Sequence, residues 1–231
     1  MNLLQCIDVN KTFGNKKVLE NINLTISKGK IIGLLGKNGT GKSTLIKLIN
    51  DLLTATSGKI LINGKEVGVD SKKIISYLPE RTYLDKSMTV DKTIEYFEDF
   101  YEDFDSAKAR QLLKDLELDT TQKLSKMSKG MKEKVQLVLV ISRKAELYIL
   151  DEPLGGVDPA TRDYILDIIL TNIDKSSSVI ISTHLISDVE KILDEVIFID
   201  KGKIILQDST SVLREKEKGS IDEIFRRMFK C

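Results

Sequence analysis

The chain is organised around residues 36–44, GKNGTGKST, which match the phosphate-binding loop pattern G-x-x-x-x-G-K-[ST] at every required position. The pattern needs a strand before it and a helix after it. Residues 30–35 form an apolar run typical of a buried strand, and residues 44–49 begin a segment with helical periodicity. The sequence therefore predicts a nucleotide site rather than a glycine-rich turn that carries Lys42 and Ser43 by chance.

The residue types in this loop suit the binding of phosphate. Gly36, Gly39 and Gly41 let the backbone curl tightly with its N–H groups pointing inward at phosphate oxygens. The free N–H groups and the dipole of the following helix N-terminus favour the same charge. Lys42 would reach the β- and γ-phosphates, and the Ser43 hydroxyl would ligate Mg²⁺.

Composition limits the classes of function. The 231 residues include 36 Lys and Arg against 35 Asp and Glu, so nothing suggests bulk electrostatic capture of nucleic acid or anionic lipid. Cys6 and Cys231 have neither metal-ligand spacing nor a redox-pair motif, which favours a reduced, cytosolic compartment. No signal peptide is recognisable, and the longest apolar run, residues 135–141 interrupted only by Gln136, is too short to span a bilayer. A function at a membrane would need a spanning partner on another chain.

The pattern of the remaining segments is that of an α/β protein. Strands are predicted at residues 4–9, 18–26, 59–65, 74–78, 146–151, 178–183, 196–200 and 203–206. Helices are predicted from residue 44 and at residues 90–101, 106–116, 128–143, 160–170 and 185–193, followed by a helical tail. Thr89 is the expected N-cap of the helix at residues 90–101, and Asp105 or Ser106 that of the next helix. Strands that alternate with helices indicate a mostly parallel sheet covered on both faces, with a helical insertion at residues 80–145.

Two amphipathic segments leave alternatives open. In the helix at residues 90–101, Tyr96 and Phe100 lie on a second face, for which packing is favoured over a docking surface. In the tail, residues 221–229 carry an apolar stripe at helical spacing, for which packing on the same domain is favoured over a partner surface.

Further candidate residues lie at the ends of predicted elements. An apolar strand ends in Asp151, where a phosphate-loop ATPase holds Mg²⁺, and the adjacent Glu152 suits a general base that polarises water. Ser128 can cap the third inserted helix. His184, the only histidine, follows a strand at the edge where open α/β sheets bind ligands. Phe13 precedes a turn, where it could stack on adenine or pack in the ordinary way.

Taken together and in this order, these residues resemble the nucleotide-binding subunit of an ATP-binding cassette (ABC) transporter. The resemblance extends from Phe13 to the hairpin that ends near Leu206. It implies an α/β fold of the P-loop NTPase (RecA-like) type in a single ABC ATPase domain, residues 1–231. The expected parts are a parallel-sheet core with an N-terminal antiparallel β subdomain at residues 1–79 and 146–208, an inserted α-helical subdomain at residues 80–145 and a C-terminal helical tail at residues 209–231.

The resemblance also implies roles for particular residues. The expected ATP contacts come from the adenine-stacking aromatic, the Walker A loop and the signature sequence, which are Phe13, Gly36, Asn38, Gly39, Gly41, Lys42, Ser43, Thr44, Ser128 and Gly130. Mg²⁺ is expected at Ser43, Glu80 and Asp151, and the expected catalytic residues are Glu152, His184 and Lys42. Residues 154–158 resemble the D-loop, and His184 the switch histidine that contacts the γ-phosphate and holds the attacking water and Glu152.

The sequence departs from the family pattern at Glu80 and in the signature. Glu80 stands where the family usually has Gln, at the residue expected to bridge Mg²⁺ and the helical subdomain. A carboxylate can still ligate the metal, but it cannot donate a hydrogen bond as an amide does. Lys129 and Met131 stand where Gly and Gln are commonest in the signature. Ser128 and Gly130, which would supply the phosphate contacts, are kept, so the pattern indicates a subfamily variant. Hydrolysis is still expected because Lys42, Ser43, Asp151, Glu152 and His184 are all present.

The function implied is that of an ATP-binding and ATP-hydrolysing subunit that powers a membrane ABC transporter through ATP-driven closure and reopening of a dimer. The expected cofactors are ATP and Mg²⁺. The expected partners are a second ABC ATPase subunit, in a homo- or heterodimer, and separate transmembrane permease subunits. Residues from Glu80 through the following aromatic helix would receive a cytoplasmic helix of the permease. This places the protein in the cytoplasm, peripheral on the inner face of the cell membrane.

Two other functions share the phosphate-binding loop. A soluble ABC-type ATPase that acts on ribosomes or DNA usually carries two cassettes or a long coiled coil, whereas this chain has one cassette, no sustained heptads and a net charge of +1, so no nucleic-acid partner is expected. A small-molecule kinase would leave the signature at Ser128 and the histidine at residue 184 without a role.

Overall fold

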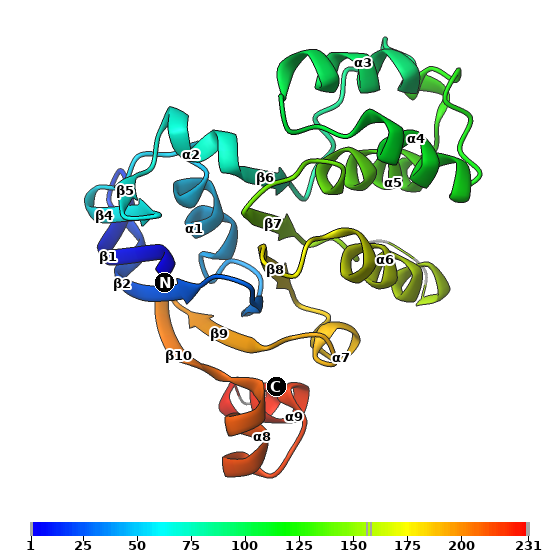
Figure 1. Cartoon of the computed structure of the whole chain (residues 1–231). Coiled ribbons are helices and arrows are strands. Elements are labelled where there is room, and N and C mark those ends of the chain that lie inside the picture. The colour runs from blue at the N-terminus through cyan, green and yellow to red at the C-terminus, as the bar shows by residue number, and fades with distance from the viewer. Residues whose placement is uncertain (1, 156, 158, 230–231) are drawn as a thin grey trace.

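The computed structural model describes residues 2–155, 157 and 159–229, which form two sheets flanked by helices (Figure 1). The smaller sheet is antiparallel, with strand order β2-β1-β4-β5. Its strands are β1 (Asn2–Phe13), β2 (Lys16–Ser27), β4 (Ser57–Ile62) and β5 (Lys65–Glu66). Asn63 and Gly64, which join β4 to β5, have φ angles of 50° and 77°, as a tight hairpin turn requires.

The larger sheet has the strand order β10-β9-β3-β8-β7-β6. Its strands are β3 (Ile31–Leu35), β6 (Ile75–Leu78), β7 (Leu147–Asp151), β8 (Ser178–Thr183), β9 (Glu195–Asp200) and β10 (Lys203–Ser209). All neighbouring pairs are parallel except the edge pair of β9 with β10. Leu35 pairs with Thr183 and Asp151 pairs with Ser182, so the chain leaves β3, β7 and β8 at the same edge of the sheet.

The helices divide between the sheets and a separate group. They are α1 (Lys42–Ile49), α2 (Val69–Ile74), α3 (Val90–Phe100), α4 (Ser106–Asp115), α5 (Lys129–Ile141), α6 (Pro159–Asn172), α7 (Ile186–Val189), α8 (Thr210–Glu217) and α9 (Ile221–Phe229). A short 3₁₀ turn, Leu124–Lys126, precedes α5. Figure 1 shows α3, α4 and α5 grouped beyond the β6 edge of the larger sheet.

Alternate residues of the parallel strands enter two different apolar cores. In β3, Ile32 and Leu34 pack with β1, β2 and α1, whereas Leu35 packs with the helical side of the molecule. Likewise Ile180 joins the first core and Ile181 the second. This division explains why these strands read as continuous apolar runs, and it confirms a parallel sheet covered on both faces.

The predicted N-caps of two helices are confirmed. The Thr89 hydroxyl accepts a hydrogen bond from the Lys92 N–H at 3.3 Å and so caps α3. The Asp105 carboxylate does the same for α4, at 2.9 Å from the Lys108 N–H. The helix predicted at residues 185–193 is wrong in length, because α7 ends at Val189. The short α2 was not predicted.

The two open alternatives have different outcomes. In the tail, Ile221, Ile224 and Phe225 are buried, and the Phe225 ring packs edge-on against Phe198 of β9 with 5.3 Å between centroids, so packing on the same domain is confirmed. The packing favoured for the second face of α3 is wrong. Tyr96 and Phe100 remain 53% and 65% exposed.

None of the helices among the described residues combines the length and the apolarity needed to cross a membrane.

A candidate nucleotide site at the carboxyl edge of the sheet

The loop between β3 and α1 is held in close contact with the strands around it. A Cβ at Gly36 would lie 2.5 Å from the Ile199 carbonyl oxygen, closer than side chains come in proteins. Gly41, immediately before α1, has a φ of 112°, and a Cβ there would lie 2.7 Å from the Leu19 side chain. Both positions therefore need glycine, for close approach at Gly36 and also for the left-handed backbone at Gly41.

Lys42 is folded back over this loop. Its side chain is buried, and its Nζ donates hydrogen bonds to the carbonyl oxygens of Gly36 at 2.7 Å and Lys37 at 3.2 Å. Burial lowers the pKa of Lys42, and the negative charges of Glu152, Asp151 and Glu80 oppose that shift. Phosphate oxygens are stronger partners for an ammonium group than neutral carbonyls, so the geometry suits an exchange of partners when a phosphate binds.

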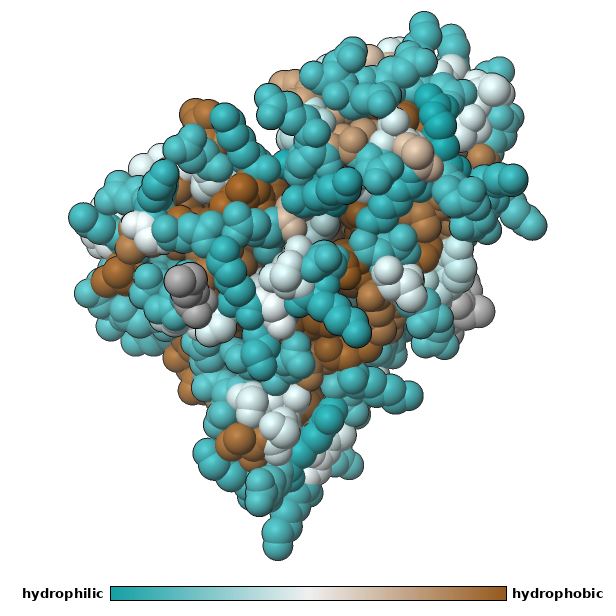
Figure 2. Space-filling view, viewed as in Figure 1, coloured by the Kyte–Doolittle hydropathy of each residue, from teal (hydrophilic) through white to brown (hydrophobic). Residues whose placement is uncertain are grey.

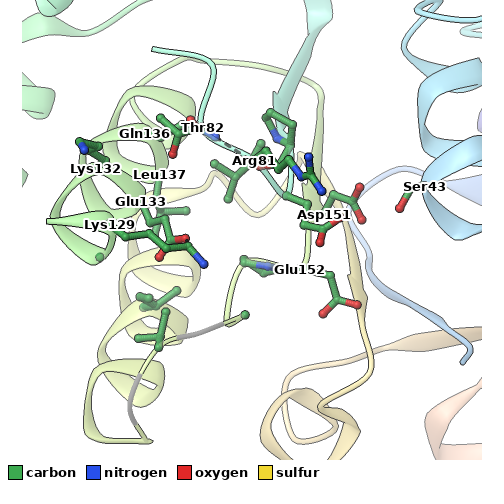
Figure 3. Close-up of a pocket in the computed structure, with 18 of the residues that line it drawn as sticks. Ser43, Arg81, Thr82, Lys129, Lys132, Glu133, Gln136, Leu137, Asp151 and Glu152 are labelled. Carbon is green, nitrogen blue, oxygen red and sulfur yellow. Dashed lines mark hydrogen bonds and ion pairs between the residues drawn. The ribbon is translucent and has the colours of Figure 1, made fainter. Parts of the chain in front are cut away.

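Asp151 ends β7 with its carboxylate buried. It is 3% exposed, and burial raises its pKa, while hydrogen bonds from Ser182 and Ser43 act in the opposite direction. The Ser182 hydroxyl donates to the Asp151 Oδ1 from the neighbouring strand β8. Figure 3 shows the Asp151 carboxylate on the side of the site that faces Ser43 of α1. The sheet register thus brings a carboxylate to the first turn of the helix that follows the phosphate-binding loop.

Glu152 is held in an uncommon backbone conformation. Its φ is 53°, and its N–H donates to the Ser182 carbonyl oxygen at 2.9 Å and to the Ser182 hydroxyl at 3.3 Å. Its Oε2 lies 2.9 Å from Nδ1 of His184. The Glu152 side chain is 12% exposed and that of His184 is 50% exposed. Ser182 of β8 therefore forms hydrogen bonds with both Asp151 and Glu152. His184, two residues after Ser182, contacts the Glu152 carboxylate.

Carboxylates outnumber cations around Lys42, although other Lys and Arg side chains line the same cleft. Glu80, in the loop after β6, acts electrostatically on both Lys42 and Asp151. Three carboxylates (Glu80, Asp151 and Glu152) therefore stand near one buried ammonium group. Among the described residues, no three His, Cys, Asp or Glu side chains are placed to hold a metal ion by themselves. The donor set still fits Mg²⁺, which keeps several waters and is bound through one or two protein oxygens together with substrate phosphates.

A cleft of about 1270 Å³ contains these groups and reaches to the first turn of α5. Two walls face one another across it. The sheet side supplies Asn38, Gly39, Gly41, Lys42, Ser43, Thr44, Asp151, Glu152 and His184, and the helical side supplies Glu80, Ser128 and Gly130. Figure 3 shows Lys129 and Lys132 of α5 across the cleft from Ser43. Figure 2 shows a notch with a mainly hydrophilic rim between the sheets and the α3–α5 group.

The first turn of α5 is exposed. The Ser128 hydroxyl caps the helix by accepting a hydrogen bond from the Met131 N–H at 3.2 Å. Gly130, in the same turn, has no positive φ, and a Cβ there would meet nothing within 4 Å. Nothing described in this chain therefore requires glycine at residue 130, although glycine in a helix costs about 0.5–1 kcal/mol relative to alanine.

Phe13 and part of the segment that resembles the D-loop are not among the described residues that line the cleft. Phe13 is 46% exposed, lies under the Lys11 ammonium at 4.7 Å, and is not among the residues that line the cleft, where Val18 lies instead. Of the segment that resembles the D-loop, residues 156 and 158 lie outside the described part of the chain.

Sequence reasoning missed two polar residues that organise the site, Ser182 and Gln136. Both are buried; Gln136 interrupts the apolar run of α5, and Ser182 follows the apolar residues of β8. An isolated polar residue in an apolar element must find a hydrogen-bond partner, and that was the available signal.

The fold and the site define the class of this protein as a phosphate-loop nucleotide triphosphatase. The family model described as ABC transporter matches residues 19–155, more than half of the chain, and the chain belongs to that family.

Curated relatives agree with this assignment. The ABC transporter ATP-binding protein YtrB of Bacillus subtilis (strain 168) is 30% identical over 205 residues, which cover 87% of this chain and 70% of YtrB. The lantibiotic transport ATP-binding protein SrtF of Streptococcus pyogenes is 31% identical over 207 residues, which cover 89% of this chain and 90% of SrtF. A solved structure of an ATP-binding subunit of an ABC transporter is similar at a TM-score of 0.88 and 26% identity, over 98% of this chain and 99% of that one.

The protein is therefore an ATPase that serves as the ATP-binding subunit of an ABC transporter, and the P-loop NTPase fold predicted from the sequence is confirmed. These findings support this function over the soluble ATPase of ribosomes or DNA.

Proposed function

We propose that this subunit works as a dimer, with itself or with a second ABC ATPase subunit. Each ATP lies between the phosphate-binding loop of one subunit and Ser128 and Gly130 of the other, and closure and reopening of the dimer drive separate permease subunits. The observation that carries this proposal is Gly130. It is exposed, and apart from its chain neighbours and the backbone of its own helix no described atom lies within 4 Å of where its Cβ would be, so the absence of a side chain can serve the approach of another molecule.

Charge at the α5 N-terminus supports a phosphate as part of that approach. The free N–H groups of the first helical turn favour an anion, and the exposed Lys129 adds positive charge. Lys129 lies 3.6 Å from Glu133, a weak surface pair that it can leave for a phosphate. Closure would then depend on the γ-phosphate, which gives the open and closed states different affinities for ATP and for ADP.

Within one subunit, we assign roles from the geometry described above. The backbone of the loop from Gly36 to Thr44, including Asn38 and Gly39, and the Lys42 ammonium bind the phosphates. Ser43 and Asp151, with Glu80, would hold Mg²⁺, whose charge would stabilise negative charge on the phosphates. Phe13 remains a candidate for adenine stacking, since it is exposed at the end of β1.

Glu152 is the proposed general base. In one tautomer, the His184 Nδ1–H donates to the Glu152 Oε2, 2.9 Å away, which fixes the carboxylate in orientation. Oε1 then remains to accept a proton from the attacking water. The left-handed backbone at residue 152 costs free energy, and such strain is concentrated at functional sites.

The permease would dock on the helical side of the cleft. Tyr96 and Phe100 of α3 are exposed and their rings stack with 6.0 Å between centroids, and Tyr83 in the loop after β6 is 53% exposed. Contiguous exposed aromatic side chains are unusual on a surface that meets only water. We propose that a cytoplasmic helix of the permease covers them, which places the subunit on the inner face of the membrane. The name of one relative, the Nod factor export ATP-binding protein I of Rhizobium sp. (strain N33), 28% identical, favours an exporter.

Sedimentation of the purified chain tests the dimer. Glu152→Gln should bind MgATP and sediment as a dimer, and Lys42→Ala combined with Glu152→Gln should remain monomeric under the same conditions. In the unsubstituted chain, hydrolysis per molecule should rise with protein concentration. A Glu152→Gln protein that stays monomeric with MgATP, together with hydrolysis per molecule independent of concentration, would contradict the proposal.

A further inference from the structure

Gln136 is a buried amide in the apolar middle of α5. Its side chain is 2% exposed, and both ends of the amide are used. The Tyr83 N–H donates to Oε1 at 3.2 Å, and Nε2 donates to the Pro79 carbonyl oxygen at 3.3 Å. Figure 3 shows the Gln136 side chain beside the loop at Thr82. One side chain thus holds the loop at residues 79–83 by both of its ends.

This loop carries Glu80, which faces the nucleotide side of the cleft. Glu80 lines the same cleft as Lys42 and Asp151 and acts electrostatically on both, so a charged ligand bound between them would act on the Glu80 carboxylate in turn. Of the α5 residues that the structure describes, only Gln136 forms a hydrogen bond to residues 79–83. Among the described residues of α5, this amide is therefore the hydrogen-bonded link through which a displacement of the loop can reach the helix.

A second set of contacts fixes the other end of α5 to the sheet. The Ser76 hydroxyl of β6 donates to the Val140 carbonyl oxygen at 2.8 Å, and the buried Arg143 donates to the Ile75 carbonyl oxygen at 2.6 Å. These contacts lie at the C-terminal end of α5, whereas Ser128 lies at its exposed N-terminal end.

Along α5, the fixed end near Val140 comes closest to Gln136, and the exposed end at Ser128 lies on the far side of Gln136. The anchored end at Val140 lies about 6 Å from Gln136 and about 18 Å from Ser128, at 1.5 Å per helical residue. A shift of the loop acting through Gln136 is therefore enlarged about threefold at Ser128 if α5 pivots as a rigid rod.

We propose that Gln136 is a positioning residue that transmits the position of the Glu80 loop to Ser128, so that MgATP in one subunit's loop sets how that subunit's α5 meets the other ATP. The inference rests on the proposed dimer. It also accounts for Glu80. A carboxylate cannot donate a hydrogen bond, and the Gln136 amide supplies both a donor and an acceptor to the same loop.

The test uses the full chain with Gln136→Met, which keeps the length of the side chain and removes both hydrogen bonds. Val138→Ala is the matched control, because Val138 is also buried in α5 but has no bond to the loop. For Gln136→Met we expect the ATP KM to stay within about twofold and kcat to fall about tenfold, the effect of losing a link of one or two hydrogen bonds. In a Glu152→Gln background, the Kd of the MgATP dimer should rise about tenfold. Val138→Ala should change kcat and Kd by less than about twofold, because it destabilises the core without cutting the link.

The outcomes separate this inference from the proposed dimer. If Glu152→Gln does not dimerise with MgATP, the proposed dimer and the role of Gln136 are both contradicted. If it dimerises and Gln136→Met leaves kcat and Kd unchanged, only the role of Gln136 is overturned. Should Gln136→Met lack a cooperative unfolding transition, Gln136→Asn decides by the same readouts, because it keeps an amide that is one methylene too short to reach the loop.

Amide hydrogen exchange tests the link between the loop at residues 79–83 and α5 without any substitution at residue 136. In Glu152→Gln, MgATP should protect the Tyr83 amide and the first turn of α5 together. Protection of one without the other would overturn the inference.

Discussion

Ser182→Ala is the substitution whose effect can be worked out most fully from the structure. The hydroxyl donates to the buried carboxylate of Asp151, and it also accepts a long hydrogen bond from the Glu152 N–H. The second bond contributes little, because the same N–H keeps its 2.9 Å bond to the Ser182 carbonyl oxygen. The first joins a hydroxyl to a charged group, and such bonds contribute about 1.5–3 kcal/mol. We expect the free energy of unfolding at neutral pH to fall by that amount.

Ser178→Ala is the matched control on the same strand. Ser178 and Ser182 are both fully buried in β8, but the Ser178 hydroxyl donates to a neutral partner, the Ser27 carbonyl oxygen, at 3.1 Å. A neutral hydrogen bond contributes about 0.5–1.5 kcal/mol. The difference between the two variants therefore isolates the charge of Asp151, and we expect it to be about 1 kcal/mol or more.

The pH dependence of that difference has a definite sign. Burial raises the pKa of Asp151 in the folded state above its value in the unfolded chain. Folded protein therefore holds this proton to higher pH, and the free energy of unfolding falls as pH rises through the folded pKa. Ser182 stabilises the ionised form, so its loss raises the pKa of Asp151 further and deepens the fall. The gap between the variants should be widest at neutral pH and narrow as Asp151 becomes protonated in acid.

Urea unfolding of the nucleotide-free chain, followed by circular dichroism from neutral pH into the acid range, measures this gap. Equal losses for Ser182→Ala and Ser178→Ala at neutral pH, or a gap that does not change with pH, would refute the reasoning.

Three further substitutions test the roles assigned to the site. Glu152→Gln should bind ATP normally but release phosphate at least about a hundredfold more slowly, since a general base contributes about 10²–10⁴ in rate; near-normal turnover would exclude Glu152 as the base. His184→Ala should lose most hydrolysis while equilibrium ATP binding changes little, and an unchanged steady-state rate would leave His184 a structural residue. Gly130→Ala should raise the free energy of unfolding in urea by about 0.5–1 kcal/mol and yet reduce phosphate release. Stabilisation with full activity would show that nothing approaches Gly130.

The sequence predicted the sheet and its central site because their signals are local. The pattern of the phosphate-binding loop lies within nine consecutive residues, 36–44, and Asp151 and His184 follow apolar strands whose order the βαβ pattern constrains. The N-caps at Thr89 and Ser128 were likewise readable, because a cap depends on the next three residues.

The features that the sequence did not predict depend on which helices and strands become neighbours in the fold. The partner of Ser182 lies 31 residues away and that of Gln136 lies 53 and 57 residues away, and no local pattern encodes such pairs. The same limit applies to Tyr96 and Phe100, whose exposure follows from where α4 and α5 pack against α3 rather than from their spacing.

Mixing two inactive variants tests most directly whether one ATP is shared between two chains. Both Lys42 and Ser128 line the cleft of a single chain, so the alternative is that each chain completes its own site. Lys42→Ala disables the loop and Ser128→Arg disables the signature, and a mixed dimer holds one site in which both halves are intact. If sites are shared, an equal mixture of the two variants should recover up to about a quarter of the unsubstituted rate of phosphate release, because half of the dimers are mixed and each has one intact site of two. If the mixture releases phosphate no faster than the sum of the two variants assayed apart, the shared site is contradicted.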